Sequence, residues 1–136
     1  DTLSGIENVM GSASDDSFTL ALGNNWIIDG GAGSDTVVLA TSSGVVTEGD
    51  LLGELNQVET LDFRSSGTTA NLTIDASFIQ QLVGQGNSSH LDLSFDAGDT
   101  WVDAAGSFTQ DLGGDHVYYS DATMTTEIAR LTVNSI

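Results

Sequence analysis

Apolar and polar residues alternate in several short stretches of the chain, and this alternation predicts β-strands. Leu61 and Phe63 would face one side of a sheet, with the polar residues beside them on the other. The same two-residue period recurs at 72–74, 91–95 and 131–133. Up to about Leu39 the pattern differs, because short apolar stretches recur every nine to ten residues, as in a solenoid. The chain is therefore predicted to be mainly β.

One segment has a helical period instead. The apolar residues between 76 and 83 form a single stripe on a helix, made by Phe78, Ile79 and Leu82. Asp75 stands where an N-cap residue is expected, and Gly84 can end the helix. We expect one short helix over 76–83 and a second short helical turn near 49–55.

A nine-residue glycine motif lies within the solenoid-like part of the chain. Residues 30–38 match every position of the pattern G-G-x-G-x-D-x-U-x, where U is a large apolar residue. Glycines at 30, 31 and 33 permit positive φ and can turn carbonyl groups toward a cation. Asp35 supplies a carboxylate, and Val37 would point inward. Because Ca²⁺ takes six to eight oxygen ligands, the motif predicts a calcium-binding turn of a parallel β-roll.

Two weaker copies of the motif precede it. Residues 11–19 place Asp16 in the aspartate position, although serines replace two of the glycines. Residues 20–28 place Asn25 in the ligand position and Ile27 in the apolar position, and one extra residue then precedes the full match. A single turn cannot bury its apolar side, so this repetition is what a stacked structure needs.

These nonapeptides resemble those of the repeats-in-toxin (RTX) family, and the resemblance covers residues 1–40. Later segments are similar to the end regions of large RTX adhesins, at 58–63, 72–75, 91–93, 117–119 and 131–133. The resemblance implies export by type I secretion, which uses an uncleaved C-terminal signal, and folding on meeting external calcium. The chain starts abruptly and without Met, so we expect a fragment of a longer protein.

The resemblance also implies a set of metal ligands. In RTX β-rolls each nonapeptide forms half a turn, so residues two repeats apart stack on one side. Asp16 and Asp35 would then share one Ca²⁺, and Asn25 would be a weaker, neutral ligand on the opposite side. Backbone carbonyl groups would complete the shared site, from Gly11, Ala13, Gly31 and Gly33. The alternative is that the weaker copies continue the coil without binding metal.

The charge balance favours a cation-binding extracellular protein. The formal net charge is -18, from 20 acidic residues against Arg64 and Arg130 alone. Such a field attracts cations and repels nucleic acids and anionic membranes. Cysteine is absent, so calcium is the expected substitute for disulfides in a secreted chain of this size. No apolar run approaches the length of a membrane span.

Other polar clusters have simpler alternative interpretations. His90 and His116 are possible general bases, yet no serine or cysteine nucleophile motif accompanies them, so we do not expect an enzyme. Asp96 and Asp99 lie in an acidic segment that suggests a further cation site, and a solvated acidic loop is the alternative.

Three aromatic residues suggest a possible sugar-binding platform. Trp101, Tyr118 and Tyr119 carry flat rings of the kind that stack on pyranose rings. Packing within the core and the strands is the alternative explanation for the same residues.

The expected organisation is one structural unit with two regions. Residues 1–40 would form the calcium-binding turns, and residues 41–136 a β-rich C-terminal cap packed on them. The expected function is a calcium-dependent folding and capping module of a secreted RTX adhesin at the bacterial cell surface. Its expected partners are calcium ions and the type I secretion machinery, and we expect a monomer. Host or surface glycans would be bound through the parent protein. The alternatives are the C-terminal module of a secreted hydrolase and a calcium-dependent carbohydrate-binding domain.

Overall fold

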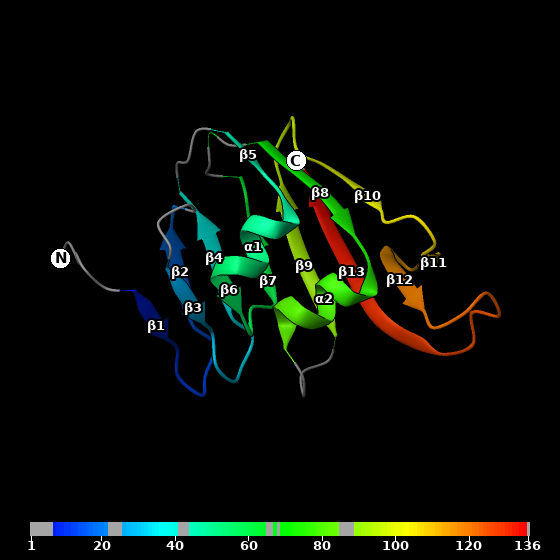
Figure 1. Ribbon diagram of the computed structural model, residues 1–136, viewed down its shortest axis with the longest axis horizontal. Coiled ribbons are helices and arrows are strands. Elements are labelled where there is room, and N and C mark those ends of the chain that lie inside the picture. The colour runs from blue at the N-terminus through cyan, green and yellow to red at the C-terminus, as the bar shows by residue number, and fades with distance from the viewer. Residues whose placement is uncertain are drawn as a thin grey trace.

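The computed structural model describes residues 7–21, 26–40, 44–64, 67, 69–84 and 89–135. In these ranges the protein is mainly β, as predicted, with two short helices (Figure 1). The strands are β1 (Asn8–Met10), β2 (Ser17–Leu20), β3 (Ile27–Asp29), β4 (Thr36–Leu39), β5 (Val45–Val46), β6 (Leu55–Asn56), β7 (Thr60–Asp62), β8 (Thr69–Ile74), β9 (His90–Phe95), β10 (Thr100–Asp103), β11 (Phe108–Leu112), β12 (Asp115–Tyr119) and β13 (Glu127–Ser135). The helices are α1 (Glu48–Glu54) and α2 (Ala76–Val83).

The first half of the chain builds three stacked levels, each a strand, a short turn and a second strand. The first strands of the levels, β1, β3 and β6, pair in parallel in one sheet. The second strands, β2, β4 and β7, pair in parallel in another. The connecting turns are 11–16 in level one, 30–35 in level two and 57–59 in level three. Equivalent residues therefore lie directly above one another.

The sheet continues well past residue 40. β9 pairs in parallel with β7, and β13 pairs in parallel with β9. β12 and β11 then extend the same seven-stranded sheet by antiparallel pairing. A separate three-stranded parallel sheet has the order β10-β8-β5. The region expected to cap the turns thus prolongs their sheet, and its last strands have a different pairing pattern.

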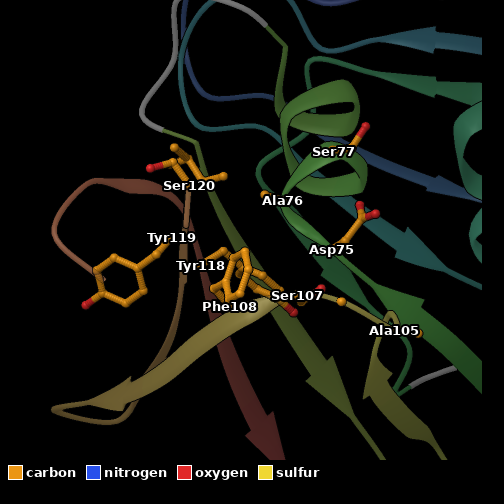
Figure 2. A pocket seen from close by; sticks show the side chains of 11 residues that line it. Asp75, Ala76, Ser77, Ala105, Ser107, Phe108, Tyr118, Tyr119 and Ser120 are labelled. Atoms are coloured by element: carbon orange, nitrogen blue, oxygen red, sulfur yellow. The ribbon is translucent and has the colours of Figure 1, made fainter. Parts of the chain in front are cut away.

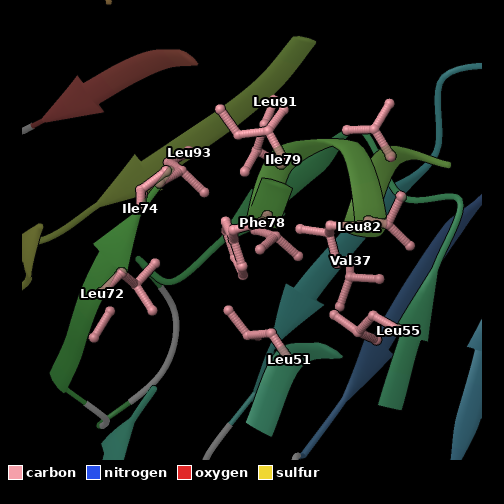
Figure 3. Packing of buried hydrophobic residues seen from close by; sticks show 14 of the residues in the cluster. Val37, Leu51, Leu55, Leu72, Ile74, Phe78, Ile79, Leu82, Leu91 and Leu93 are labelled. Atoms are coloured by element: carbon pink, nitrogen blue, oxygen red, sulfur yellow. The ribbon is translucent and has the colours of Figure 1, made fainter. Parts of the chain in front are cut away.

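The helices cover one face of the long sheet and bury the core beneath them. α1 and α2 lie next to each other, with α2 over β9 and β13 (Figure 1). α2 has the predicted bounds, and the predicted N-cap Asp75 accepts a hydrogen bond from the Phe78 amide at 2.7 Å. The apolar stripe of α2 points into a buried cluster (Figure 3). The other residues of this cluster come from α1 and several strands, and they include Val37, Leu51, Leu55, Leu72, Ile74, Leu91 and Leu93.

The predicted alternation is confirmed in most strands and shifted in one. Leu61 and Phe63 are fully buried, as expected. In β3, however, Ile27 is 50% exposed and Ile28 is 2% exposed, so the apolar position expected at Ile27 belongs to Ile28. The register explains the shift, because Val9 of β1 pairs with Ile28. A one-residue change of phase moves every side chain of a strand to the opposite face.

Candidate cation site at the stacked turns

Backbone hydrogen bonds hold the turns of neighbouring levels in close contact. The Gly11 amide donates to the Asp29 carbonyl at 2.7 Å, and the Ala32 amide donates to the Ser12 carbonyl at 3.2 Å. The Gly30 amide continues the series by donating to the Asn56 carbonyl at 3.0 Å. Levels one, two and three are thereby joined at their turns as well as along their strands.

The glycines occur where two levels approach too closely for a side chain. A Cβ atom on Gly30 would lie 2.1 Å from the Gln57 carbonyl oxygen, and one on Gly31 would lie 2.3 Å from the Ser12 carbonyl oxygen. Gly31 and Gly33 also have positive φ, at 98° and 128°. The sequence motif predicts positive φ at Gly30 too, and this detail is wrong. Gly30 is required by space, because a backbone oxygen occupies the place of its side chain.

Three acidic residues stack at the ends of the turns, and we call Asp16, Asp35 and Glu59 the carboxylate column. The Asp16 amide donates to Asp35 Oδ1 at 2.8 Å, across a sequence separation of 19 residues. The Asp35 amide donates in turn to Glu59 Oε2 at 2.8 Å, across 24 residues. Each carboxylate below thus accepts the backbone amide of the acidic residue above it.

Asp35 is the most deeply buried member of the carboxylate column. Its side chain is 0% exposed, and Oδ2 has no hydrogen-bond partner among the described residues. In level one, by contrast, Asp16 Oδ2 accepts the Ser12 amide at 2.6 Å, and this hydrogen bond lowers the pKa of Asp16. The equivalent amide of level two, at Gly31, donates to Asp29 Oδ1 at 3.1 Å instead. The Gly31 amide therefore donates to Asp29 and not to Asp35 Oδ2, which would otherwise have the partner that Asp16 Oδ2 has in level one.

The chain has few cations of its own to neutralise this buried carboxylate. Its only Lys or Arg residues are Arg64 and Arg130. Arg64 pairs with Asp62 at 2.6 Å, and Arg130 pairs with Glu127 at 2.8 Å on β13. Burying an ionised carboxylate is unfavourable unless it is paired or bound to a metal. Among the described residues Asp35 Oδ2 has no such partner, and an unpartnered buried carboxylate oxygen beside glycine turns suits a cation from solution.

The structure brings together most of the predicted ligand residues. The carboxylates of Asp16 and Asp35 lie in adjacent turns, which also hold Gly11, Ala13, Gly31 and Gly33. Asn25 lies outside the described residues. In the described part of the chain, no three Asp, Glu or His side chains gather in a metal-binding arrangement. A cation at these turns would therefore depend on backbone carbonyl oxygens as well as carboxylates, which is how Ca²⁺ is often bound.

The acidic segment around Asp99 is used for backbone hydrogen bonds. Asp99 Oδ1 accepts the Ala70 amide at 2.7 Å, and Asp99 Oδ2 accepts the Asp96 amide at 2.8 Å. Oδ1 of Asp99 thus fastens the 96–99 turn to β8, and Oδ2 closes the turn itself. These contacts give Asp99 a structural role and leave the cation site suggested for Asp96 and Asp99 as a prediction.

Glu59 is the functional candidate that the sequence analysis does not identify. It is 8% exposed and lies in the same register as Asp35, because Thr36 pairs with Thr60. The signal is a short one: an acidic residue, then Thr, then an apolar residue, at both 35–37 and 59–61. The three motif glycine positions before Glu59, residues 54, 55 and 57, are Glu, Leu and Gln, so the nonapeptide pattern gives no indication of a third level there.

The two histidines form hydrogen bonds on separate strands. His90 Nε2 lies 2.8 Å from Thr132 Oγ1. His116 lies between two carboxylates, with Nε2 3.0 Å from Asp103 Oδ1 and Nδ1 2.5 Å from Asp111 Oδ1. These contacts connect β10, β11 and β12 at the far end of the sheet from the carboxylate column.

Two of the three aromatic residues considered as a sugar platform, Trp101 and Tyr118, pack edge-on against the same ring, that of His116. Trp101 packs edge-on against His116, with ring centroids 5.0 Å apart. Tyr118 is 1% exposed, and its hydroxyl donates to Asp103 Oδ1 at 2.9 Å. Burial raises the pKa of Tyr118 above its ordinary value. Core and strand packing, the alternative given for these residues, accounts for Tyr118.

An open pocket of about 260 Å³ lies between the start of α2 and the β11–β12 hairpin (Figure 2). Tyr119 lines it together with Phe108, and its ring extends to the side away from α2 (Figure 2). Asp75 and three serines, Ser77, Ser107 and Ser120, contribute polar groups to it. Asp75 already caps α2 through Oδ1, so the pocket is in part a consequence of how that helix begins.

Comparisons with known proteins add no assignment. The chain matches no known protein family, no curated protein and no solved structure. Among the described residues, neither helix has the length or the apolar character needed to cross a bilayer. The geometry of the stacked turns and the carboxylate column is therefore the basis for a functional proposal.

Proposed function

We propose that this protein is a calcium-binding module whose folding depends on calcium. The observation that carries the proposal is Asp35 Oδ2, which is fully buried and has no partner among the described residues. Asp16 and Asp35 would hold one Ca²⁺ between turns 11–16 and 30–35. The backbone carbonyl groups expected to complete the ligand set belong to Gly11, Ala13, Gly31 and Gly33.

The donor set suits calcium better than other common cations. Carboxylate and carbonyl oxygens are hard ligands, and Ca²⁺ accepts six to eight of them in flexible geometry. Mg²⁺ requires a stricter octahedron and usually keeps several waters, while Zn²⁺ favours thiolate and imidazole ligands. The chain contains no Cys, and both histidines lie at other strands. Calcium is therefore the cation that the turns fit best.

Calcium binding would act mainly on folding. With a formal net charge of -18, the chain repels itself, and a bound divalent cation reduces this repulsion where carboxylates are buried. An ion that binds only the folded state stabilises it by about 2.7 kcal/mol when its concentration is a hundredfold above Kd. Extracellular calcium modules have Kd values of about 10⁻⁴ to 10⁻³ M, so the module would fold outside the cell and remain unfolded in the cytosol.

This behaviour suits a protein that is exported unfolded. The nonapeptides resemble those of RTX proteins, and we propose a non-enzymatic folding and capping module of a secreted RTX adhesin at the bacterial cell surface. Residues 41–136 would serve as the cap, since β11 and β12 end the parallel ladder with antiparallel strands. The proposed partners are calcium ions and the type I secretion machinery. We propose a monomer that binds no nucleic acid and does not insert into membranes.

Substitution of Asp35 tests the proposal against simple charge screening. Thermal melting followed by circular dichroism, in EDTA and in millimolar Ca²⁺, gives the calcium-dependent gain in stability for each variant. Asp35→Ala should lose most of this gain. Asp121→Ala removes the same charge from an exposed turn and should keep it. Equal losses in both variants would show that calcium acts as a diffuse counterion, and the proposal would then be wrong.

A further inference from the structure

We infer that a second cation site lies between levels two and three, with Glu59 as its additional carboxylate and Asp35 shared between both sites. The inference rests on the proposed calcium binding and extends it to a level that lacks the glycine motif. The class of ligand is a hard divalent cation, with Ca²⁺ as the probe. Glu59 would then be a metal ligand outside every nonapeptide of the chain.

The hydrogen bonds of the carboxylate column repeat from one step to the next. The Asp16 amide donates a hydrogen bond to Asp35 Oδ1 at 2.8 Å, and the Asp35 amide donates one to Glu59 Oε2 at the same distance. The strand registers agree, because Ser17 pairs with Thr36 and Thr36 pairs with Thr60. Glu59 therefore has the same position relative to Asp35 as Asp35 has relative to Asp16. The step from level two to level three is built from the same contacts as the step from level one to level two.

The unpartnered oxygen of Asp35 also lies close to level three. The position that a Gly30 Cβ would occupy is 2.5 Å from Asp35 Oδ2 and 2.1 Å from the Gln57 carbonyl oxygen. A carboxylate oxygen of level two and a carbonyl oxygen of level three therefore lie close to each other beside Gly30. Oxygens of these two kinds make up calcium sites.

The turn of level three is shorter, and it holds the Gln57 carbonyl oxygen in place. Gln57 lies in the register of Gly30, because Asp29 pairs with Asn56, and it adopts a positive φ of 51°. Non-glycine residues adopt such φ values infrequently, so the conformation needs support from its surroundings. Glu59 follows after only one intervening residue, and its side chain is one methylene longer than that of Asp35. A longer acidic side chain suits a shorter turn, because it reaches the space that the missing turn residues leave.

The carboxylate column ends below Glu59. Thr60 pairs with Asp92 of β9, so the residue at the next position of the column is Leu91, which is fully buried and apolar. The described part of the column therefore contains two steps between acidic residues, Asp16 to Asp35 and Asp35 to Glu59. Two steps predict two ions, one for each pair of adjacent levels.

The number of bound ions tests the inference. Native mass spectrometry and calorimetric titration of the full chain with Ca²⁺ should find two ions in the unchanged protein. Glu59→Gln should bind one ion, Asp16→Asn should bind one, and Asp35→Asn should bind none. Asp121→Asn is the matched control and should bind two. Circular dichroism at high Ca²⁺ verifies that each variant is folded.

The outcomes separate this inference from the proposed function. If the unchanged chain binds no Ca²⁺, the proposed function is wrong and the inference fails with it. If it binds one ion that Glu59→Gln keeps and Asp16→Asn loses, the proposed function stands and the inference is overturned. If the unchanged chain binds one ion that Glu59→Gln loses and Asp16→Asn keeps, that ion lies between levels two and three. This result supports the inference and not the site between levels one and two. If Glu59→Gln does not fold, Glu59→Asp keeps the charge and should bind one ion more weakly; unchanged affinity for both ions overturns the inference.

Discussion

Replacement of Gly30 by alanine tests the close approach of levels two and three. The new Cβ would lie 2.1 Å from the Gln57 carbonyl oxygen, 2.5 Å from Asp35 Oδ2 and 2.7 Å from Asp35 Cβ. Cβ atoms in proteins essentially never lie within 3.0 Å of a non-bonded atom, so the atoms around the new methyl group have to move. The nearest obstacle is backbone and cannot rotate away like a side chain. The two levels must separate, and the strands that follow each turn must shift with them.

The expected loss of stability follows from the kind of clash. Inserting a methylene group into a well-packed interior costs about 1 to 3 kcal/mol, and a rigid backbone obstacle places Gly30→Ala at the upper end. For a chain of this size, about 3 kcal/mol corresponds to a fall in Tm of roughly 10 °C. The same methyl group would press on Asp35 Oδ2, so the calcium-dependent gain in stability should fall as well.

Gly53→Ala is the matched control for this experiment. Gly53 lies in α1, and a Cβ there would meet nothing within 4 Å. Alanine is favoured over glycine inside a helix by about 0.5 to 1 kcal/mol, so this variant should melt a few degrees higher than the unchanged protein. Both variants are compared by circular dichroism melts in EDTA and in Ca²⁺. If Gly30→Ala melts within 2 °C of the unchanged protein (roughly 0.5 kcal/mol), the levels do not pack as described.

Two further predictions concern the helix and the end of the sheet. Asp75→Ala removes the N-cap bond to the Phe78 amide and should lower the free energy of unfolding by about 1 kcal/mol in urea, whereas an unchanged midpoint would refute the capping role. Because burial raises the pKa of Tyr118, its contribution to stability is present below the unfolded pKa of about 10 and is lost as pH rises above it. Melting between pH 8 and 11.5 should show this loss in the unchanged protein, and Tyr118→Phe should reduce it; parallel curves would contradict the assignment.

Local sequence signals predicted the elements that depend on neighbouring residues. The helix over 76–83 was predictable because its N-cap, apolar stripe and terminal glycine all lie within ten residues. The turn at 30–35 was predictable because three glycines and an aspartate have fixed spacing. In both cases the residues that determine the conformation are close together in the sequence.

The features that the sequence did not predict depend on pairing between distant segments. The Glu59 side chain accepts a hydrogen bond from the Asp35 amide across a separation of 24 residues that includes α1, and the turn before Glu59 contains no glycine. The contacts of His116 with Asp103 and Asp111 likewise require β10, β11 and β12 to be placed first. The phase of β3 follows from its pairing with β1, which a single extra residue was enough to obscure.

The central claim is that Asp35 Oδ2 is a calcium ligand, and a crystal structure of the protein grown with Ca²⁺ tests it most directly. The anomalous difference map should contain a peak at about 2.3 to 2.6 Å from Asp35 Oδ2, surrounded by carboxylate and carbonyl oxygens of the turns. A map without such a peak, with Asp35 Oδ2 hydrogen-bonded to a water molecule or a protein donor, would contradict the claim.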